Sequence, residues 1–176
     1  MTAGVIETER LSLHELSADV AEDAPFIYRL LNGPDFLKNI GDRGVHSLEE
    51  ASAYLRKGPM ASYLVNGFGL YRVQVKSSGD TVGLCGLVRR ITLPDPDLGY
   101  ALLPGFYGRG YATEAASAVM ADARARLRIG CILAITGPRN VASIRALEKV
   151  GFHYRNSVRL TPEAEELKLF ASTAEG

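Results

Sequence analysis

The sequence predicts one mixed α/β (α+β) domain over residues 1–176, with six to seven strands and about four helices. Several segments alternate between apolar and polar residues, which is the period of a half-buried strand, and others have the spacing of amphipathic helices. In the middle of the chain a helical segment stands between two strand segments, and this arrangement supplies the crossover that sets two strands parallel. The length fits one compact domain better than two.

The first third of the chain predicts one strand and two helices. Residues 8–16 alternate, and residues 23–31 carry apolar side chains at helical spacing before the stop signal Gly33-Pro34. Ser47 and Glu50 form the pattern of a capping box, in which Ser47 accepts from the amide three residues on and Glu50 reaches back to the Ser47 amide. We expect a second helix from there to about residue 56.

The middle of the chain predicts a three-strand meander and then a long helix. Residues 68–76 and 81–91 indicate a hairpin, because the turn residues Ser-Ser-Gly-Asp separate them. Residues 95–103 are the third strand. A helix follows within residues 108–127, with an apolar stripe along one side.

The last third predicts a strand, a helix and two closing strands. Residues 131–136 are continuously apolar, which is typical of a strand buried on both faces, as in a parallel pairing. Residues 140–150 indicate a helix that ends at Gly151. Residues 152–159 and 166–171 are the closing strands.

The composition excludes several classes of function. The net charge is zero, which argues against a general nucleic-acid-binding or membrane-binding surface. The N-terminus lacks the pattern of a signal peptide, and no stretch reaches about 18 uninterrupted apolar residues. We therefore expect a cytoplasmic protein that does not span a membrane.

The charged residues are nevertheless unevenly distributed. Residues 61–160 hold thirteen Lys/Arg against six Asp/Glu, a net charge of +7. This excess favours a local site for an anionic ligand, although scattered solvated arginines explain it equally well.

The two cysteines predict neither a metal site nor a disulfide. Cys85 and Cys131 both lie in apolar runs, and neither belongs to a CxxC or Cys/His cluster. Buried free thiols are the simplest interpretation, and we expect no metal. A cysteine nucleophile would need a histidine partner that the sequence does not place.

Three glycines before the long helix carry the strongest chemical signal. Gly105, Gly108 and Gly110 follow the strand that ends near residue 103. Glycines here let the backbone bend so that its amides point inward, and the first amides of a helix have no internal partner. Such a turn suits a pyrophosphate. The spacing GxxGxG matches neither the P-loop nor the dinucleotide fingerprint GxGxxG, which argues against a generic nucleotide-binding domain.

Four blocks of the sequence resemble one protein superfamily. Residues 107–115, YGRGYATEA, resemble the acyl-CoA loop of the GNAT acetyltransferases, and most closely the RimJ/RimL-like branch of ribosomal-protein alanine N-acetyltransferases. Residues 97–102 resemble that branch's fourth strand, residues 140–152 its last helix and following strand, and residues 7–11 its first strand. The resemblance covers nearly the whole chain in the right order.

This resemblance implies a fold and a cofactor. The fold is a mostly antiparallel sheet with a central pair of parallel strands, and the pantetheine arm of acetyl-CoA lies where that pair splays apart. Backbone amides of the loop hold the pyrophosphate, Asn140 bonds the pantetheine, and Arg109 meets a phosphate unless it is simply solvated. The residues expected to bind acetyl-CoA are Leu102, Leu103, Phe106, Tyr107, Gly108, Arg109, Gly110, Tyr111, Ala112, Asn140 and Ser143.

Two positions depart from the superfamily pattern. Gly105 stands where relatives often have Gln or Arg, so one side-chain tie to the cofactor is absent. Leu147 stands where many relatives carry a Tyr that serves as general acid, so a Tyr acid at that position is excluded.

Asp97 and Ser143 are the expected catalytic residues. Asp97 occupies the position where relatives often have Glu, and it is the first choice for the base, acting directly or through water. A strand-end Asp that caps a turn is the alternative. Ser143 is the candidate acid, unless it merely bonds a carbonyl one turn back.

The expected function is acetyl transfer from acetyl-CoA to a primary amine, either a protein N-terminus or a small amine. A non-catalytic acyl-CoA-binding module or sensor on the same fold is the alternative. Residues 22–60 and 153–171 should form the acceptor pocket, and their acidity is compatible with a cationic amine, although ordinary surface charge explains it equally. The sequence leaves the oligomeric state open, a homodimer included.

Overall fold

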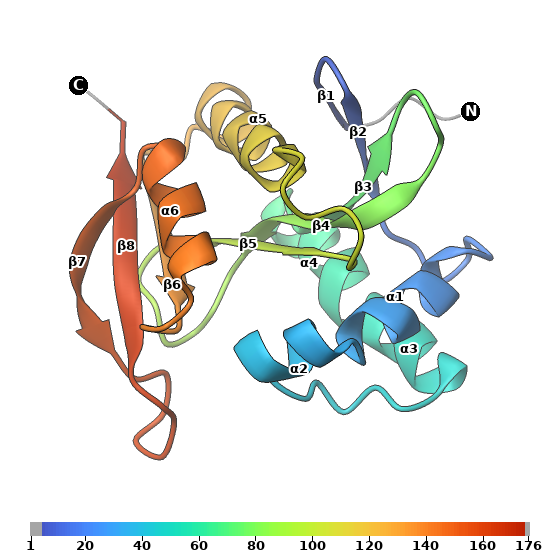
Figure 1. The fold of residues 1–176 in the computed structure, drawn as a ribbon, viewed down its shortest axis with the longest axis horizontal. Coiled ribbons are helices and arrows are strands. Elements are labelled where there is room, and N and C mark those ends of the chain that lie inside the picture. Colours follow the sequence, from blue (N-terminus) through green and yellow to red (C-terminus); the bar gives the residue numbers. More distant parts are fainter. Residues whose placement is uncertain (1–4, 175–176) are drawn as a thin grey trace.

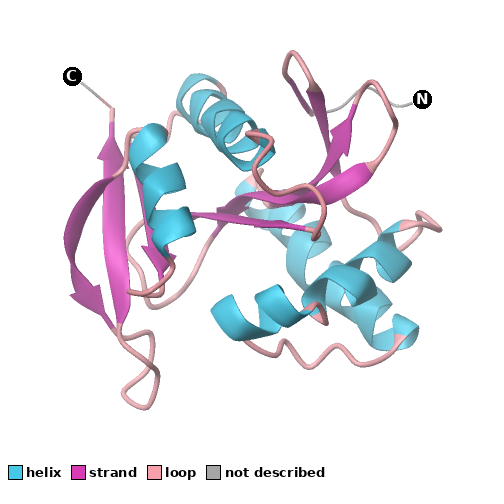
Figure 2. Cartoon of the chain, in the orientation of Figure 1, coloured by secondary structure: helices cyan, strands magenta, loops and turns pink. Residues whose placement is uncertain are grey.

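The computed structural model describes residues 5–174, which form one sheet of eight strands with helices on both faces (Figures 1 and 2). Only β5 and β6 pair in parallel, and every other neighbouring pair is antiparallel. In spatial order, the strands are β1 (Ile6–Glu7), β2 (Leu11–Glu15), β3 (Leu70–Val75), β4 (Thr81–Val88), β5 (Asp97–Leu102), β6 (Cys131–Thr136), β8 (Leu167–Thr173) and β7 (His153–Val158).

The described part of the chain contains five separate helices, one of which is built from three consecutive helical segments. Those three are α3 (Leu48–Leu55), the π-helical turn η1 (Arg56–Met60) and α4 (Ala61–Asn66). The others are α1 (Asp23–Leu31), α2 (Pro34–Asn39), α5 (Tyr111–Ala125) and α6 (Val141–Lys149).

The predicted class, a mixed sheet with one parallel pair, is confirmed, and the strand count is one higher than expected. The additional strand is β1, which has two residues and is too short to show alternation. The capping box differs in one bond. Ser47 Oγ accepts from the Glu50 amide at 3.0 Å as predicted, but Glu50 Oε2 accepts from the amide of His46 at 2.6 Å rather than from that of Ser47.

Two apolar clusters cover the two faces of the sheet. Successive strand residues point to opposite faces, and Leu98 accordingly packs in the cluster beneath α5, whereas Leu103 packs in the cluster with α1 and α3. Val119, Met120 and Ala123 are the buried stripe of α5. Each fully buried leucine contributes roughly 1.5–3 kcal/mol relative to an exposed one. The sheet therefore lies between two groups of helices (Figure 1).

The parallel pair β5–β6 separates almost as soon as it forms. Its ladder contains the single pair Asp97–Leu133, supported by a hydrogen bond from the Leu133 amide to the Pro96 carbonyl at 2.9 Å. On its other edge β5 pairs with β4 along its whole length, from Asp97 to Leu102. The later residues of β5 therefore have no strand partner on the β6 side (Figure 1).

Candidate active site

A glycine turn links the free end of β5 to the start of α5. Gly105, Gly108 and Gly110 adopt φ angles of 93°, 72° and 78°, a region that side chains with a Cβ rarely occupy. Gly110 is the N-cap of α5, and no side chain caps the helix there. The amides of the first helical turn, including those of Tyr111 and Ala112, are therefore available to an anion, and they carry the positive end of the helix dipole.

The three glycines differ in the space around them. A Cβ at Gly105 or Gly108 would meet nothing within 4 Å, so these two positions require glycine for backbone conformation alone. A Cβ at Gly110 would lie 3.3 Å from Nη2 of Arg10. Gly110 therefore also makes room for the Arg10 side chain, which is distant in the sequence but adjacent in the fold.

Arg10 and Glu114 connect this turn to the segment between β1 and β2. Glu114 Oε1 accepts from Thr8 Oγ1 at 2.7 Å and from the Arg10 amide at 3.0 Å, while its Oε2 accepts from Arg10 Nε at 2.6 Å. Arg10 Nη1 donates to the Arg109 carbonyl at 2.9 Å, and its guanidinium lies 4.8 Å from the ring centre of Tyr111. We call this set of contacts the Arg10–Glu114 clamp.

The clamp is an electrostatic contact that the sequence did not reveal. Its partners are about a hundred residues apart in the chain, and the blocks 7–11 and 107–115 resembled the superfamily separately. Burial raises the pKa of Glu114, but the hydrogen bonds from Thr8 and Arg10 and the charge of Arg10 outweigh it, so the pKa is lowered. Glu114 is therefore held in its ionised form.

Side chains of the turn contact neighbouring elements. Tyr107 Oη donates to Asp35 Oδ2 on α2 at 3.1 Å, and the guanidinium of Arg109 lies 5.5 Å from the ring centre of Phe106. Within residues 5–174, Arg109 forms no ion pair. Its charge is thus free to meet a phosphate.

The backbone at the end of β5 distinguishes two of the predicted cofactor residues. The Leu103 amide donates to the Val82 carbonyl at 2.8 Å, and the Leu103 carbonyl accepts from the Phe106 amide at 3.3 Å. Leu103 and Phe106 therefore use these groups within the protein. Backbone groups alternate in direction along a strand. The backbone amide and carbonyl of Leu102 therefore point away from β4, toward the edge of β5 that has no strand partner.

A hydrogen-bonded cluster joins β5 to α6. Tyr100 Oη lies 3.0 Å from Ser143 Oγ and 3.2 Å from the Ser143 carbonyl. Asn140, the N-cap of α6, accepts from the Ser143 amide through Oδ1 at 3.2 Å, so its amide nitrogen stays open to a ligand. Burial raises the pKa of Tyr100, and the phenol is held protonated. Tyr100 was not among the predicted site residues.

Asp97 lies at the start of β5, opposite Val88 of β4. Its side chain is 1% exposed, and both carboxylate oxygens accept from Arg90 Nε, at 3.0 and 3.2 Å. Burial raises the pKa of Asp97, and the charge and hydrogen bonds of Arg90 oppose that effect. The carboxylate is therefore closed to direct contact with an amine in this arrangement.

No cluster of three or more His, Cys, Asp or Glu side chains among residues 5–174 has the arrangement of a metal site. None of the helices described is long and apolar enough to cross a membrane.

Comparisons with known proteins agree with this arrangement. The acetyltransferase (GNAT) domain model matches residues 10–153. The Bacillus subtilis protein YkkB is 34% identical over 95 residues, which is 53% of this chain and 55% of YkkB, so the match spans about half of each protein. The N-acetyltransferase YoaA of the same bacterium is 25% identical over 157 residues, 88% of this chain and 86% of YoaA.

A solved structure extends the likeness to nearly the whole fold. The ribosomal-protein-S5-alanine acetyltransferase from Vibrio fischeri superposes with a TM-score of 0.78 at 18% identity, covering 95% of this chain and 94% of that chain. The chain therefore belongs to the GNAT family of N-acetyltransferases. Acetyl-CoA is the acetyl donor that this family uses.

Proposed function

We propose that this chain transfers the acetyl group of acetyl-CoA to a primary amine, on a protein N-terminus or a small molecule, by direct attack of the amine on the thioester. One observation carries the proposal: β5 leaves its parallel partner after Asp97 and runs directly into the glycine turn before α5. An extended pantetheine arm can thus pair with the free edge of β5 while a pyrophosphate meets the open amides at its end.

The residues present fit such a donor. The first amides of α5 and the turn before them would hold the pyrophosphate, Arg109 would neutralise a phosphate charge, and Leu102 and Asn140 would bond the pantetheine amides. When bound, acetyl-CoA supplies an activated thioester carbonyl. The pKa of a primary amine is about 8 to 10.4, so the group is mostly protonated near neutral pH. It must lose that proton before it attacks, because an ammonium group has no lone pair.

Asp97 is the proposed base, acting through water. Arg90 orients the carboxylate, and burial keeps the pKa of Asp97 above its ordinary value, which makes the carboxylate a better proton acceptor. Tyr100 and Ser143 are the proposed acid pair for the departing thiolate. Leu147 of α6 stands where many relatives carry a Tyr acid and has no hydroxyl. The phenol of Tyr100 on β5, which is hydrogen-bonded to Ser143, would supply a hydroxyl in its place.

Release of free CoA during turnover tests the function. Acetyl-CoA would be incubated with the protein and with ribosomal N-terminal peptides, spermidine, free amino acids and aminoglycosides, and the thiol released would be measured. We expect saturable thiol release with at least one of these classes and an acetylated amine by mass spectrometry. Binding of acetyl-CoA without thiol release from any amine would instead support the non-catalytic module.

A further inference from the structure

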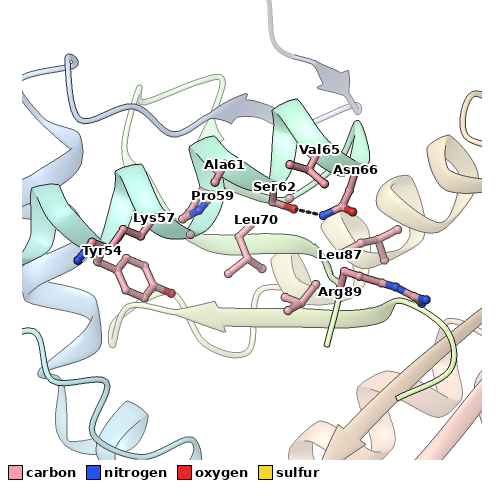
Figure 3. Close-up of a pocket in the computed structure, with 13 residues that line it drawn as sticks. Tyr54, Lys57, Pro59, Ala61, Ser62, Val65, Asn66, Leu70, Leu87 and Arg89 are labelled. Carbon is pink, nitrogen blue, oxygen red and sulfur yellow. Dashed lines mark hydrogen bonds between the residues drawn. The ribbon is translucent and has the colours of Figure 1, made fainter. Parts of the chain in front are cut away.

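A groove lies between the helix α3–η1–α4 and strands β3 and β4 (Figure 3). It has a volume of about 380 Å³ and is lined by residues of both elements, including Tyr54, Lys57, Leu70 and Val88. A second hollow of about 410 Å³ shares Tyr54 and Lys57 with it and extends to the loop at Arg43. Together they form one surface, which we call the α3 groove, with room for a small molecule.

The charges that line the α3 groove are mainly positive. Arg43, Lys57 and Arg89 contribute three cations, against the single carboxylate of Glu50. Glu50 is already bonded to the His46 amide. Figure 3 shows Tyr54 and Lys57 toward one end of the groove and Arg89 toward the other.

Two of these cations have no partner in the described part of the chain. Arg89 donates to the Pro94 carbonyl at 2.9 Å, but neither Arg43 nor Lys57 forms a side-chain hydrogen bond or an ion pair with any of residues 5–174. Cations without partners that line a concave surface raise the local concentration of anions. Their arrangement therefore favours a negatively charged ligand.

The α3 groove adjoins the proposed base. Val88 lines the groove and lies directly opposite Asp97 in the β4–β5 ladder. Burial raises the pKa of the Tyr54 phenol, and the charges of Arg43 and of Arg90, which holds Asp97, oppose that effect. Tyr54 and Leu70, which line the groove, pack in the cluster with α1 and α3, on the face of the sheet opposite α5.

Resting on the function proposed above, we propose that the α3 groove binds an anionic group of the acceptor, and that the acceptor is a primary amine that carries a carboxylate or a phosphate. From the sequence, the acidity of residues 22–60 is compatible with a cationic amine, and ordinary surface charge explains it equally well. The structure gives several of those acids partners: Asp23 pairs with Arg72, Asp42 lies 3.4 Å from His46, and Glu50 accepts from a backbone amide. Arg43 and Lys57 are left to line the groove.

Three amines on one scaffold test this inference. Tyramine carries no anion, tyrosine adds a carboxylate and O-phosphotyramine adds a phosphate. For each we would measure kcat/KM and, with CoA saturating the donor site, binding by calorimetry. We expect tyrosine or O-phosphotyramine to be favoured over tyramine by about tenfold or more, as charge-assisted contacts allow. Which of the two is favoured identifies the anion.

A pair of double variants supplies the matched control. Arg43→Gln with Lys57→Gln should remove most of that preference and leave tyramine within about twofold, whereas Arg29→Gln with Lys38→Gln makes the same change of charge outside the groove and should leave the preference intact. Equal binding and turnover of the three amines, or a preference that survives the groove variant, would overturn the inference while the acetyltransferase function stands. Absence of acetyl-CoA binding and of thiol release with every amine would mark failure of the function itself.

Discussion

Among the described residues, Tyr100 is the one tyrosine whose hydroxyl links β5 to α6, through its contact with Ser143. Tyr100→Phe keeps the ring and removes the hydroxyl. We expect kcat to fall on the order of 10²-fold, because general acid catalysis contributes about that much, with little change in the KM for acetyl-CoA. Steady-state kinetics across pH would also show loss of the alkaline limb of the profile.

Tyr28→Phe is the control for this change, because Tyr28 is exposed on α1. Ser143→Ala should reproduce part of the loss of kcat, since Ser143 shares the hydrogen bond. If Tyr100→Phe kept both the wild-type kcat and the wild-type pH profile, the leaving thiolate would depart without help from this pair.

Asp97 and Arg90 make a second prediction at the residue scale. Arg90 lowers the pKa of Asp97 against the effect of burial, so Arg90→Met should raise that pKa further. A base works only when deprotonated, and the acid limb of kcat/KM should therefore move to higher pH. Arg29→Met on the exposed face of α1 is the control. An unmoved acid limb in a folded Arg90→Met protein would show that Asp97 is not the base.

At the scale of elements, the Arg10–Glu114 clamp positions the turn before α5. Glu114→Gln should weaken acetyl-CoA binding about tenfold with little effect on kcat, because the turn loses its tie to the β1–β2 segment. The substitution should also lower the free energy of unfolding at pH 7 by about 1 kcal/mol. A hydrogen bond to a charged group contributes more than this when buried, but the exposure of Arg10 weakens it. Calorimetry and thermal unfolding would measure the two effects.

The pH dependence of that loss has a definite sign. In the folded state the pKa of Glu114 is lowered from its ordinary value of 4.5. The clamp therefore stabilises the fold above that ordinary value, and its contribution disappears as pH falls through the lowered pKa. The stability difference between the wild type and Glu114→Gln should shrink in acid, whereas Glu148→Gln on α6 should show no such pattern. A pH-independent difference would contradict the ionic nature of the clamp.

Elements with a strong apolar period were predictable, and those shaped by local backbone chemistry were not. The helix at residues 23–31 and the strand at residues 131–136 match α1 and β6 because buried side chains fix their pattern. Helix α2 buries no residue, so no apolar period predicts it, and it begins at Pro34, a favourable first helical position that is also part of the stop signal for α1. The expected helix end near residue 56 matches the end of α3 at Leu55, but the sequence did not predict the π-helical turn, which accommodates Pro59 and leads without a break into α4.

At the scale of the whole molecule, the sheet separates two groups of helices, and our proposals place the acetyl donor on one side and the acceptor on the other. The glycine turn, α5 and α6 lie with one apolar cluster, and α1, α3 and the α3 groove lie with the other. The early divergence of β5 from β6 is where the two sides can meet. The glycine turn could be predicted from the sequence, since its residues are contiguous in the chain. The clamp, Tyr100–Ser143 and the α3 groove join distant segments, and no local pattern encodes them.

Titration of acetyl-CoA into the wild type and two glycine variants tests the donor site most directly. Gly108 and Gly79 have φ angles of 72° and 77°, and a Cβ at either would meet nothing within 4 Å, so Gly108→Leu and Gly79→Leu carry similar backbone strain. Only Gly108 lies in the turn before α5. We expect the wild type and Gly79→Leu to bind acetyl-CoA alike and Gly108→Leu to bind at least about tenfold more weakly. Equal affinity in all three proteins, or no binding by the wild type, would contradict the assignment of this turn to the pyrophosphate.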